Sequence, residues 1–570
     1  MNSDLSKRAR FIGIAFCLAA LVLVSKLYIV QIVHGDEYRA RADRQYARPS
    51  QGAWDRGSIF FSGKDGSVVS AATLQNGFLL ALHPNRIADA AGLWKALSPL
   101  LALDEKSFFQ KAEKAGDPYE EIAKRVPENV GSAISQKKLA GVSLYADRWR
   151  LYPAGRLASP VLGFVGYKGE DFKGQYGLER YYEDVLHRDN SGLYTNFFAE
   201  IFSSVKKAIS TDERFEGDIV TTIEPAVQGF LEHKLSDLRE KFGAKQGGAV
   251  VMDPKTGEIY AMASFPNFDP NAYQLEEDPS VYSNPLVESV YEMGSILKPI
   301  TIASGLDAGV ITATSTYMDE GFLVLNTAKI SNFDGKGRGK VTMQEVLNQS
   351  LNTGAATVAL KLGAKRFRSY MTDFGLGEET GIDLPGEAGG LLDNLKSNRD
   401  IEMATASYGQ GIALTPIQTA RALASLGNGG LLVTPHVVKK INYRVGLSKS
   451  VGGATGLRLA IKPETSAEIT RMLVEVVDKA LLAGAFKMEH YSVAAKTGTA
   501  QIADSKGGGY YEDRFLHSFF GYFPAYDPRF IVFLYLLEPQ GVSFASHTLT
   551  SPFMDTAKFL INYYEVPPDR

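Results

Sequence analysis

The chain has 570 residues, of which 45% are apolar and 22% are charged, and its formal net charge is −3. A chain of this length can form two or three domains with a large core, and its composition excludes wholesale disorder. The slightly acidic charge excludes a basic footprint for nucleic acid, and the only cysteine, Cys17, excludes both an intrachain disulfide and a metal site built from cysteines.

The first predicted element is a membrane anchor over residues 11–33. Basic residues in the short tail before it, residues 1–10, precede an apolar run in which Lys26 is the only charged residue. As a helix this run would be about 34 Å long, enough to cross a hydrocarbon core of about 30 Å. The preceding positive charge predicts a cytoplasmic tail, with the rest of the chain outside the cytoplasm. The alternatives are a cleaved signal peptide, for which no convincing cleavage site follows, and a lipoprotein signal, which Phe16 before Cys17 opposes.

Residues 34–215 are predicted to form an elongated pedestal domain without catalytic residues. They mix polar helical patterns with short strands and many turn signals. The arginines in two turn-rich segments, Arg56 and Arg150, are interpreted as surface or domain-packing residues. A second domain, residues 216–570, is predicted to begin just before an amphipathic helix that opens with Pro225, because proline is favoured in the first turn of a helix.

A β-hairpin is predicted next, with strands over residues 249–252 and 258–262. Its turn contains Lys255-Thr256-Gly257, a tripeptide that occurs again at Lys496. The copy at Lys255 is interpreted as a plain turn, because Pro254 initiates it and no strand of small residues leads into it.

Residues 291–299 are the first candidate for chemistry. If a helix begins near Gly294, Ser295 and Lys298 stand on one face of it, where a hydroxyl and an amine can share a proton. Pro299 suits the first turn of such a helix, and the apolar periodicity after it predicts that the helix is buried. The spacing alone is not diagnostic. Three other serine–lysine pairs share it, namely Ser135/Lys138, Ser203/Lys206 and Ser204/Lys207.

Two further motifs follow Ser295 in an informative order. Residues 350–352 read Ser-Leu-Asn, and residues 496–499 read Lys-Thr-Gly-Thr after a strand-like run of small residues. Ser-x-x-Lys, Ser-x-Asn and Lys-Thr-Gly in this order are the signature of penicillin-binding proteins and serine β-lactamases. Each motif is weak alone, whereas the ordered triple is specific.

The motifs supply the parts of an acyl-transfer site. Ser295 is the predicted nucleophile, and Lys298 is the base that takes its proton. A lysine that is neutral near pH 7 needs its pKa lowered from about 10.4, at a cost of about 4–5 kcal/mol. Burial and a second cation supply such a shift, and Lys496 is the predicted cation. Ser350 can relay a proton between the lysine and a leaving amine, and Asn352 can bond the substrate amide and fix Lys298.

The third motif is predicted to hold the substrate. Lys496 is expected to bind a substrate carboxylate, helped by the hydroxyls of Thr497 and Thr499. Gly498 is expected to let a substrate backbone lie close along the strand. The backbone N–H groups of Ser295 and Thr499 would form an oxyanion hole.

With these motifs, the chain resembles a class B penicillin-binding protein, a membrane-anchored peptidoglycan transpeptidase, over nearly its whole length. Segments at Arg56, Tyr152 and Gly177 resemble the pedestal of that family, and residues 248–266 and 406–416 resemble its transpeptidase domain. The resemblance implies an α+β fold, in which an antiparallel sheet is flanked by helices and has a helical subdomain beside it. It implies no cofactor and no metal ion.

The resemblance also implies the reaction. The substrate would be the D-alanyl-D-alanine end of a stem peptide, whose carboxylate meets Lys496, Thr497 and Thr499. Acylation of Ser295 would release D-alanine, and an amine of a neighbouring stem would resolve the ester to form a cross-link. β-Lactam antibiotics would acylate the same serine.

Within this family, the run Ser-Leu-Asn-Thr-Gly at residues 350–354 is more similar to the cell-division type than to the elongation type, which tends to carry aspartate in place of Asn352. The implied partners are a membrane-embedded glycan polymerase and other division proteins. The implied location is the inner (cytoplasmic) membrane, with the catalytic domain on its outer side. An elongation-type enzyme stays open as the alternative.

Two rival functions also stay open. A β-lactamase would need a glutamate or a modified lysine to drive deacylation, and a β-lactam sensor or scaffold would bind penicillin without cross-linking peptides. The chain also departs from the family pattern at residues 60–66 and at residues 544–553, where a glycine pair is usual. These departures leave the pedestal contacts and one wall of the cleft open.

Overall fold

The computed structural model describes residue 26 and residues 54–114, 116–168, 171–189, 216–397, 399–444, 448–452, 458–504 and 508–570. The predicted anchor lies outside these residues except for Lys26, and it stays a prediction. Within the described ranges, no helix is both long and apolar enough to cross a membrane. The chain divides into two compact units, a smaller one with residues 75–149 and a larger one with residues 56–74, 150–188 and 216–570.

The smaller unit combines helices with part of a sheet. The second half of β3 (Val68–Leu82) pairs antiparallel with β4 (Glu120–Pro127), and β5 (Val142–Leu151) also pairs with β3. Two of its helices, α3 (Ala90–Leu97) and α4 (Glu105–Ala112), begin at acidic caps, because Asp89 and Asp104 accept hydrogen bonds from the first turns. The unit also contains α5 (Glu128–Gln136) and the 3-10 turn η2 (Pro84–Arg86).

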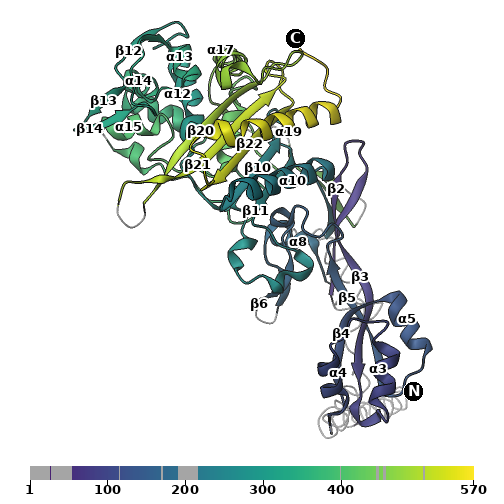
Figure 1. The fold of residues 1–570 in the computed structure, drawn as a ribbon. Helices are drawn as coiled ribbons and strands as arrows, with labels where there is room; N and C mark the ends of the chain where they lie inside the picture. The colour runs from purple at the N-terminus through teal and green to yellow at the C-terminus, as the bar shows by residue number, and fades with distance from the viewer. Residues whose placement is uncertain are drawn as a thin grey trace, which may run out of the picture. The chain divides into compact units, whose positions relative to one another are not determined.

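The larger unit is built on a five-stranded antiparallel sheet in the order β11-β10-β22-β21-β20 (Figure 1). Its first two strands form the predicted hairpin, and β20 lies at one edge of the sheet. The strands are β10 (Gln246–Met252), β11 (Ile259–Phe265), β20 (Ala494–Ala503), β21 (Tyr510–Phe523) and β22 (Phe530–Leu537).

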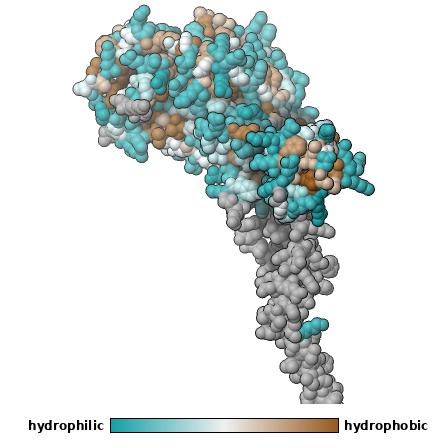
Figure 2. Space-filling view, turned by 60° about the horizontal axis from the view of Figure 1, so that its bottom comes forward, coloured by the Kyte–Doolittle hydropathy of each residue, from teal (hydrophilic) through white to brown (hydrophobic). Residues whose placement is uncertain are grey.

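Helices cover both faces of this sheet, because alternate residues of a strand point to opposite sides. In β10, Ala249 and Val251 belong to one core, while Val250 and Met252 belong to the other. The face of the molecule shown in Figure 2 is largely hydrophilic, with hydrophobic residues scattered over it. The first core contains residues of α10 (Pro225–Phe242) and α19 (Thr550–Tyr563), and the second contains residues of α12 (Lys298–Asp307), α14 (Asn352–Asp373), α16 (Pro416–Ala424) and α17 (Pro463–Glu475).

A small helical region beside the sheet completes the α+β organisation that the sequence predicts, and the start of α10 at Pro225 confirms the predicted helix. In this region β12 pairs with β15, and β13 pairs with β14. Its elements are β12 (Thr316–Asp319), β13 (Phe322–Leu325), β14 (Ala328–Ser331), β15 (Gly339–Thr342), α13 (Met343–Asn348) and α15 (Asp400–Ala406).

Part of the predicted pedestal packs within the larger unit. Arg56 and Arg150 converge on Glu179, with Nε to carboxylate distances of 2.5 and 2.6 Å, and all three side chains are almost inaccessible. The two arginines are therefore packing residues and not surface residues. Residues 56–74 and 150–188 cluster with residues 216–570, whereas the sequence-based division assigns them to the pedestal. That division at residue 215 follows the order of patterns along the chain. Such patterns do not reveal which distant strands pair in the fold.

One such pairing joins β2 (Ile59–Ser62) in parallel to β9 (Gly217–Thr221), which in turn pairs with β17 (Val438–Tyr443). The remaining elements that position no site residue are β1 (Trp54–Arg56), α6 (Ser159–Leu162), β6 (Val165–Lys168), β7 (Asp171–Gly174), α7 (Gly177–Tyr181), α8 (Glu183–Leu186), β8 (His187–Asp189), η4 (Pro270–Leu275), η5 (Pro279–Tyr282), α11 (Pro285–Glu288), η7 (Asp393–Lys396), β16 (Leu431–Leu432), β18 (Ser448–Ser450) and β19 (Arg458–Leu459).

Candidate active site

The turn that carries Ser295 is shaped by glycine. A 3-10 turn, η6 (Gly294–Leu297), precedes α12, so the α-helix itself begins at Lys298 and not at the predicted Gly294. Gly294 has a φ of +66° and donates its N–H to the carbonyl oxygen of Gly409. Glycine reaches this left-handed conformation without steric cost. The turn leaves Ser295 partly exposed and Lys298 fully buried.

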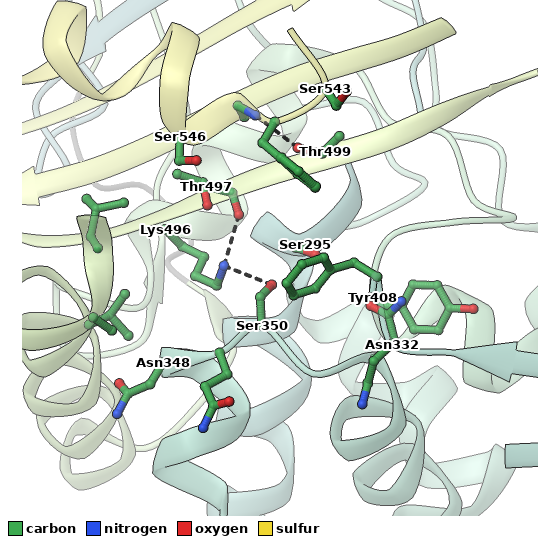
Figure 3. A pocket seen from close by; sticks show the side chains of 18 of the residues that line it. Ser295, Asn332, Asn348, Ser350, Tyr408, Lys496, Thr497, Thr499, Ser543 and Ser546 are labelled. Atoms are coloured by element: carbon green, nitrogen blue, oxygen red, sulfur yellow. Dashed lines mark hydrogen bonds between the residues drawn. The ribbon is translucent and has the colours of Figure 1, made fainter. Parts of the chain in front are cut away.

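One hydroxyl oxygen connects the two lysines of the motifs. Lys298 Nζ donates to Ser350 Oγ at 3.0 Å and to the Ser350 carbonyl oxygen, and Lys496 Nζ donates to the same Oγ at 3.0 Å. Figure 3 shows Ser295, Ser350 and Lys496 gathered in one cleft. Because both acceptor positions of the Ser350 hydroxyl are used, its own proton remains available for donation into the cleft.

The two amines differ in proton affinity. Burial, followed by the charge of Lys496, holds the pKa of Lys298 well below its ordinary value. Burial alone lowers the pKa of Lys496 to about 8. Two ammonium groups on one oxygen repel each other, so the buried Lys298 gives up its proton first. A neutral Lys298 amine can donate both N–H groups to Ser350 and still keep a lone pair to accept the proton of Ser295.

Ser350 itself sits in an unusual backbone conformation, with a φ of +54°. It ends the turn between α13 and α14, and Asn352 opens α14. The Asn352 side chain donates to the carbonyl oxygen of Ser331 at 2.9 Å. In the part of the chain that is described, Lys298 donates to Ser350, and no hydrogen bond joins it to Asn352, so the role of Asn352 in fixing Lys298 stays a prediction. Asn352 still lines the cleft, where it can meet a substrate amide.

Strand β20 brings the third motif to the edge of the sheet. Lys496 is buried, while Thr497 and Thr499 are partly exposed and line the cleft. Gly498 does not face a substrate as the sequence predicts. A Cβ at this position would lie 2.3 Å from Ser518 Oγ and 2.7 Å from the carbonyl oxygen of Met293, so the missing side chain lets β20 lie against the turn that carries Ser295.

The cleft has a volume of about 910 Å³. In the described part of the chain, every charged residue that lines it is basic, namely Lys329, Arg338 and Lys496. This charge favours a substrate with a carboxylate. No group of three or more His, Cys, Asp or Glu side chains in the described ranges could hold a metal ion.

Sequence reasoning missed several residues of the cleft walls. Asn332, Tyr408 and Phe544 line it, and the rings of Phe333 and Phe544 meet edge to face at 5.7 Å. Tyr408 belongs to a stretch that the sequence marks by family resemblance, and Phe544 begins the stretch that departs from the family pattern, so a signal existed for both. Asn332 and Phe333 lie in an irregular loop that has no motif.

The second Lys-Thr-Gly triplet has no part in this cleft. Lys255 lies in the turn between β10 and β11 and forms an ion pair with Asp527 at the surface. Gly257 in the same turn has a φ of +83°. The interpretation of this triplet as a plain turn is confirmed.

Two family models match the chain. The penicillin-binding protein transpeptidase domain matches residues 247–556, which is more than half of the chain, and the penicillin-binding protein dimerisation domain matches residues 55–197. All eight motif residues, from Ser295 to Thr499, fall inside the first match.

Similar proteins extend over most of the chain. Stage V sporulation protein D of Bacillus subtilis is 32% identical over 97% of this chain and 85% of that protein. Peptidoglycan D,D-transpeptidase FtsI of Escherichia coli K12 is 26% identical over 94% of this chain and 88% of that protein. The crystal structure of penicillin-binding protein 2X from Streptococcus thermophilus has a TM-score of 0.72 at 20% identity, covering 90% of this chain and 81% of that one, and so shares the fold.

Proposed function

The chain belongs to the penicillin-binding protein transpeptidase family, and from this membership we propose that it is a peptidoglycan D,D-transpeptidase whose nucleophile is Ser295. The observation that carries the proposal is the Ser350 hydroxyl, which accepts hydrogen bonds from both Lys298 and Lys496 in the cleft that Ser295 lines. This arrangement supports the proposed roles of Ser295 as nucleophile, Lys298 as base, Ser350 as proton relay and Lys496 as the cation that binds the substrate.

The acylation step follows from this arrangement. Ser295 Oγ attacks the carbonyl carbon of the penultimate D-alanine, and its proton passes to the neutral Lys298 amine. The C–N bond to the last D-alanine breaks, and its nitrogen leaves as an amine after taking a proton through Ser350. The product is an ester of Ser295.

The second step reverses these roles with a new amine. The amine of a neighbouring stem peptide attacks the ester carbonyl, loses a proton to Lys298, and displaces Ser295, which regains its own proton. One amide bond breaks and one forms, so the exchange needs no external energy source. The N–H groups of Ser295 and Thr499 are proposed to stabilise the oxyanion in both steps.

The substrate carboxylate is proposed to bind at the β20 end of the cleft. Lys496 supplies the charge, and the hydroxyls of Thr497 and Thr499 supply hydrogen bonds. The Thr499 hydroxyl already accepts a hydrogen bond from the N–H of Ala545 at 3.1 Å, which leaves its own proton to donate.

The finer assignment concerns the role of the enzyme in the cell, its membrane location and its partners. The Ser-Leu-Asn-Thr-Gly run at residues 350–354 supports a role in septal cell-wall synthesis, with elongation as the alternative. We place residues 34–215 as the pedestal and residues 11–33 as the anchor that holds the enzyme in the cytoplasmic membrane. A membrane-embedded glycan polymerase and other division proteins are the proposed partners. Depletion of the protein should give long undivided cells, whereas swollen cells would favour elongation.

The test of the nucleophile is the mass of the intact protein after incubation with benzylpenicillin. The wild-type chain should gain one persistent adduct, and Ser295→Ala should gain none. Ser135→Ala removes a serine with the same spacing to a lysine and should still gain the adduct. An adduct on Ser295→Ala would overturn the assignment. An adduct that is released rapidly would favour a β-lactamase, and labelling without peptide cross-linking would favour a sensor or scaffold.

A further inference from the structure

Next to the second motif lies a buried carboxylate that the steps above do not use. Asp319, the last residue of β12, is 2% exposed. Its Oδ1 accepts hydrogen bonds from Thr353 Oγ1 at 2.8 Å and from the N–H of Gly321 at 3.0 Å, and its Oδ2 accepts from the N–H of Arg338 at 3.1 Å. Asn332 Nδ2 lies 3.0 Å from both oxygens. Asp319 therefore joins four groups from separate parts of the helical region.

The Asp319 network ends on the first turn of α14. Thr353 directly follows Asn352, and its N–H donates to Asn332 Oδ1 at 3.3 Å. Its hydroxyl lies 3.0 Å from the hydroxyl of Tyr317. The residue that precedes α14, Leu351, offers no side-chain cap. Since the first N–H groups of a helix have no partner within the helix, the side chain of Asn332 takes the place of that cap.

Ser350 depends on this support. Its φ of +54° is a conformation that serine seldom adopts and that the surrounding structure must enforce. Ser350 lies two residues before Asn352, so the position of the first turn of α14 sets the direction of its hydroxyl. Asn352 is held from the same side, because it donates to the carbonyl oxygen of Ser331, the neighbour of Asn332.

We propose that Asp319 is a positioning residue for acyl transfer. Its carboxylate fixes the start of α14 through Thr353 and Asn332, and it thereby holds Ser350 Oγ between the two lysine amines. The inference rests on the proposed roles of Ser295 and Ser350, and it assigns no chemical step to Asp319 itself.

Asp383 provides a matched control. It is also buried, at 6% exposure, and accepts hydrogen bonds from the N–H groups of Val437 and Val438 at 2.7 and 2.9 Å and from the hydroxyl of Tyr182 at 3.1 Å. It belongs to the same unit of the structure but does not line the cleft. Asp383 accepts three hydrogen bonds and Asp319 accepts five, so each substitution disturbs a buried carboxylate with several partners.

The experiment measures acylation of the full-length protein by a fluorescent penicillin, together with the melting temperature of each variant. Both aspartate variants should lower the melting temperature, and Asp319→Asn should lower it more because it disturbs more hydrogen bonds. Only Asp319→Asn should slow acylation, by about 10- to 100-fold, because a small misplacement of a reacting group has a large effect on rate. The loss should fall on the acylation rate constant and not on the initial binding constant of the penicillin.

A second pair of variants tests the positioning role of Asp319 if Asp319→Asn does not fold. Thr353→Ser keeps the hydroxyl and should be acylated at nearly the wild-type rate, whereas Thr353→Val should be slow. Wild-type acylation by folded Asp319→Asn, an equal slowing in Asp383→Asn, or equal rates for the two Thr353 variants would overturn the proposal. A wild-type protein that takes no label would instead contradict the assignment of Ser295.

Discussion

Lys298 and Lys496 are buried where they donate hydrogen bonds to the Ser350 hydroxyl. The free-energy cost of burying a charged amine lowers the pKa of each lysine. An ammonium group buried beside a second one is poorly solvated, so the proton of Lys298 is easily lost. Lys496 keeps its proton longer because burial lowers its pKa only to about 8. The same pair of residues can thus hold a base and a cation at one pH.

This difference predicts the pH dependence of acylation. The rate should fall as the pH drops through the lowered pKa of Lys298, because a protonated amine cannot accept the proton of Ser295. It should also fall as the pH rises through about 8, because Lys496 then loses the charge that binds the substrate carboxylate. The measurement is the second-order rate constant for a fluorescent penicillin from acidic to alkaline pH.

Lys496→Arg is the control for the alkaline limb. A guanidinium group stays charged at high pH, so any residual activity of this variant should not decline on the alkaline side. A wild-type rate that stays constant well above pH 8 would contradict the assigned role of Lys496.

At the scale of the elements, the site depends on how closely β20 approaches η6. Gly498 removes the side chain that would collide with Ser518 and with the carbonyl oxygen of Met293. Ser518 Oγ donates to the same carbonyl oxygen at 2.8 Å, so it joins the neighbouring strand to the nucleophile turn. The distance between Ser295 and Lys496 is therefore set by backbone packing.

We expect Gly498→Ala to destabilise the protein by about 1–3 kcal/mol, the usual cost of overpacking. It should also slow acylation by about 10-fold or more, because β20 must move away from Ser295. Thermal unfolding and penicillin labelling measure the two effects. Gly229→Ala is the control, since a Cβ there would lie 3.8 Å from its nearest neighbour and a helical glycine-to-alanine change stabilises by up to about 1 kcal/mol. Unchanged labelling of Gly498→Ala would contradict this account.

At the scale of the whole molecule, two segments that precede residue 216 share a buried core with the residues that follow it. Ile59 and Phe61 of β2, with Leu178 and Leu186, belong to the same buried core as α12 and α14. Glu179 holds two buried arginines in the same region. A chain that starts at residue 216 would expose this part of its core to water.

We therefore expect a fragment of residues 216–570 to be insoluble or to lack a cooperative thermal transition. A fragment of residues 56–570 should unfold cooperatively and should still bind penicillin. Circular dichroism on heating, combined with penicillin labelling, compares the two. A stable, labelled 216–570 fragment would show instead that the segments before it contribute little to the core.

The sequence by itself determined the three motifs, their order and the class of chemistry, because acyl transfer needs particular residue types at short spacings. It also predicted the hairpin of β10 and β11, the helix at Pro225 and the plain turn at Lys255. These features depend on local backbone preferences, which are determined by residues close together in the sequence.

The tertiary structure alone decided which groups meet. Lys496 and Ser350 lie 146 residues apart in sequence, and the contact of Gly498 with the nucleophile turn depends on the packing of an edge strand. The hydrogen bond of Asn352 to Ser331 and the network around Asp319 are likewise set by the fold of the helical region. A hydrogen bond needs its two atoms within about 3 Å, and chain order does not fix such a distance between remote segments.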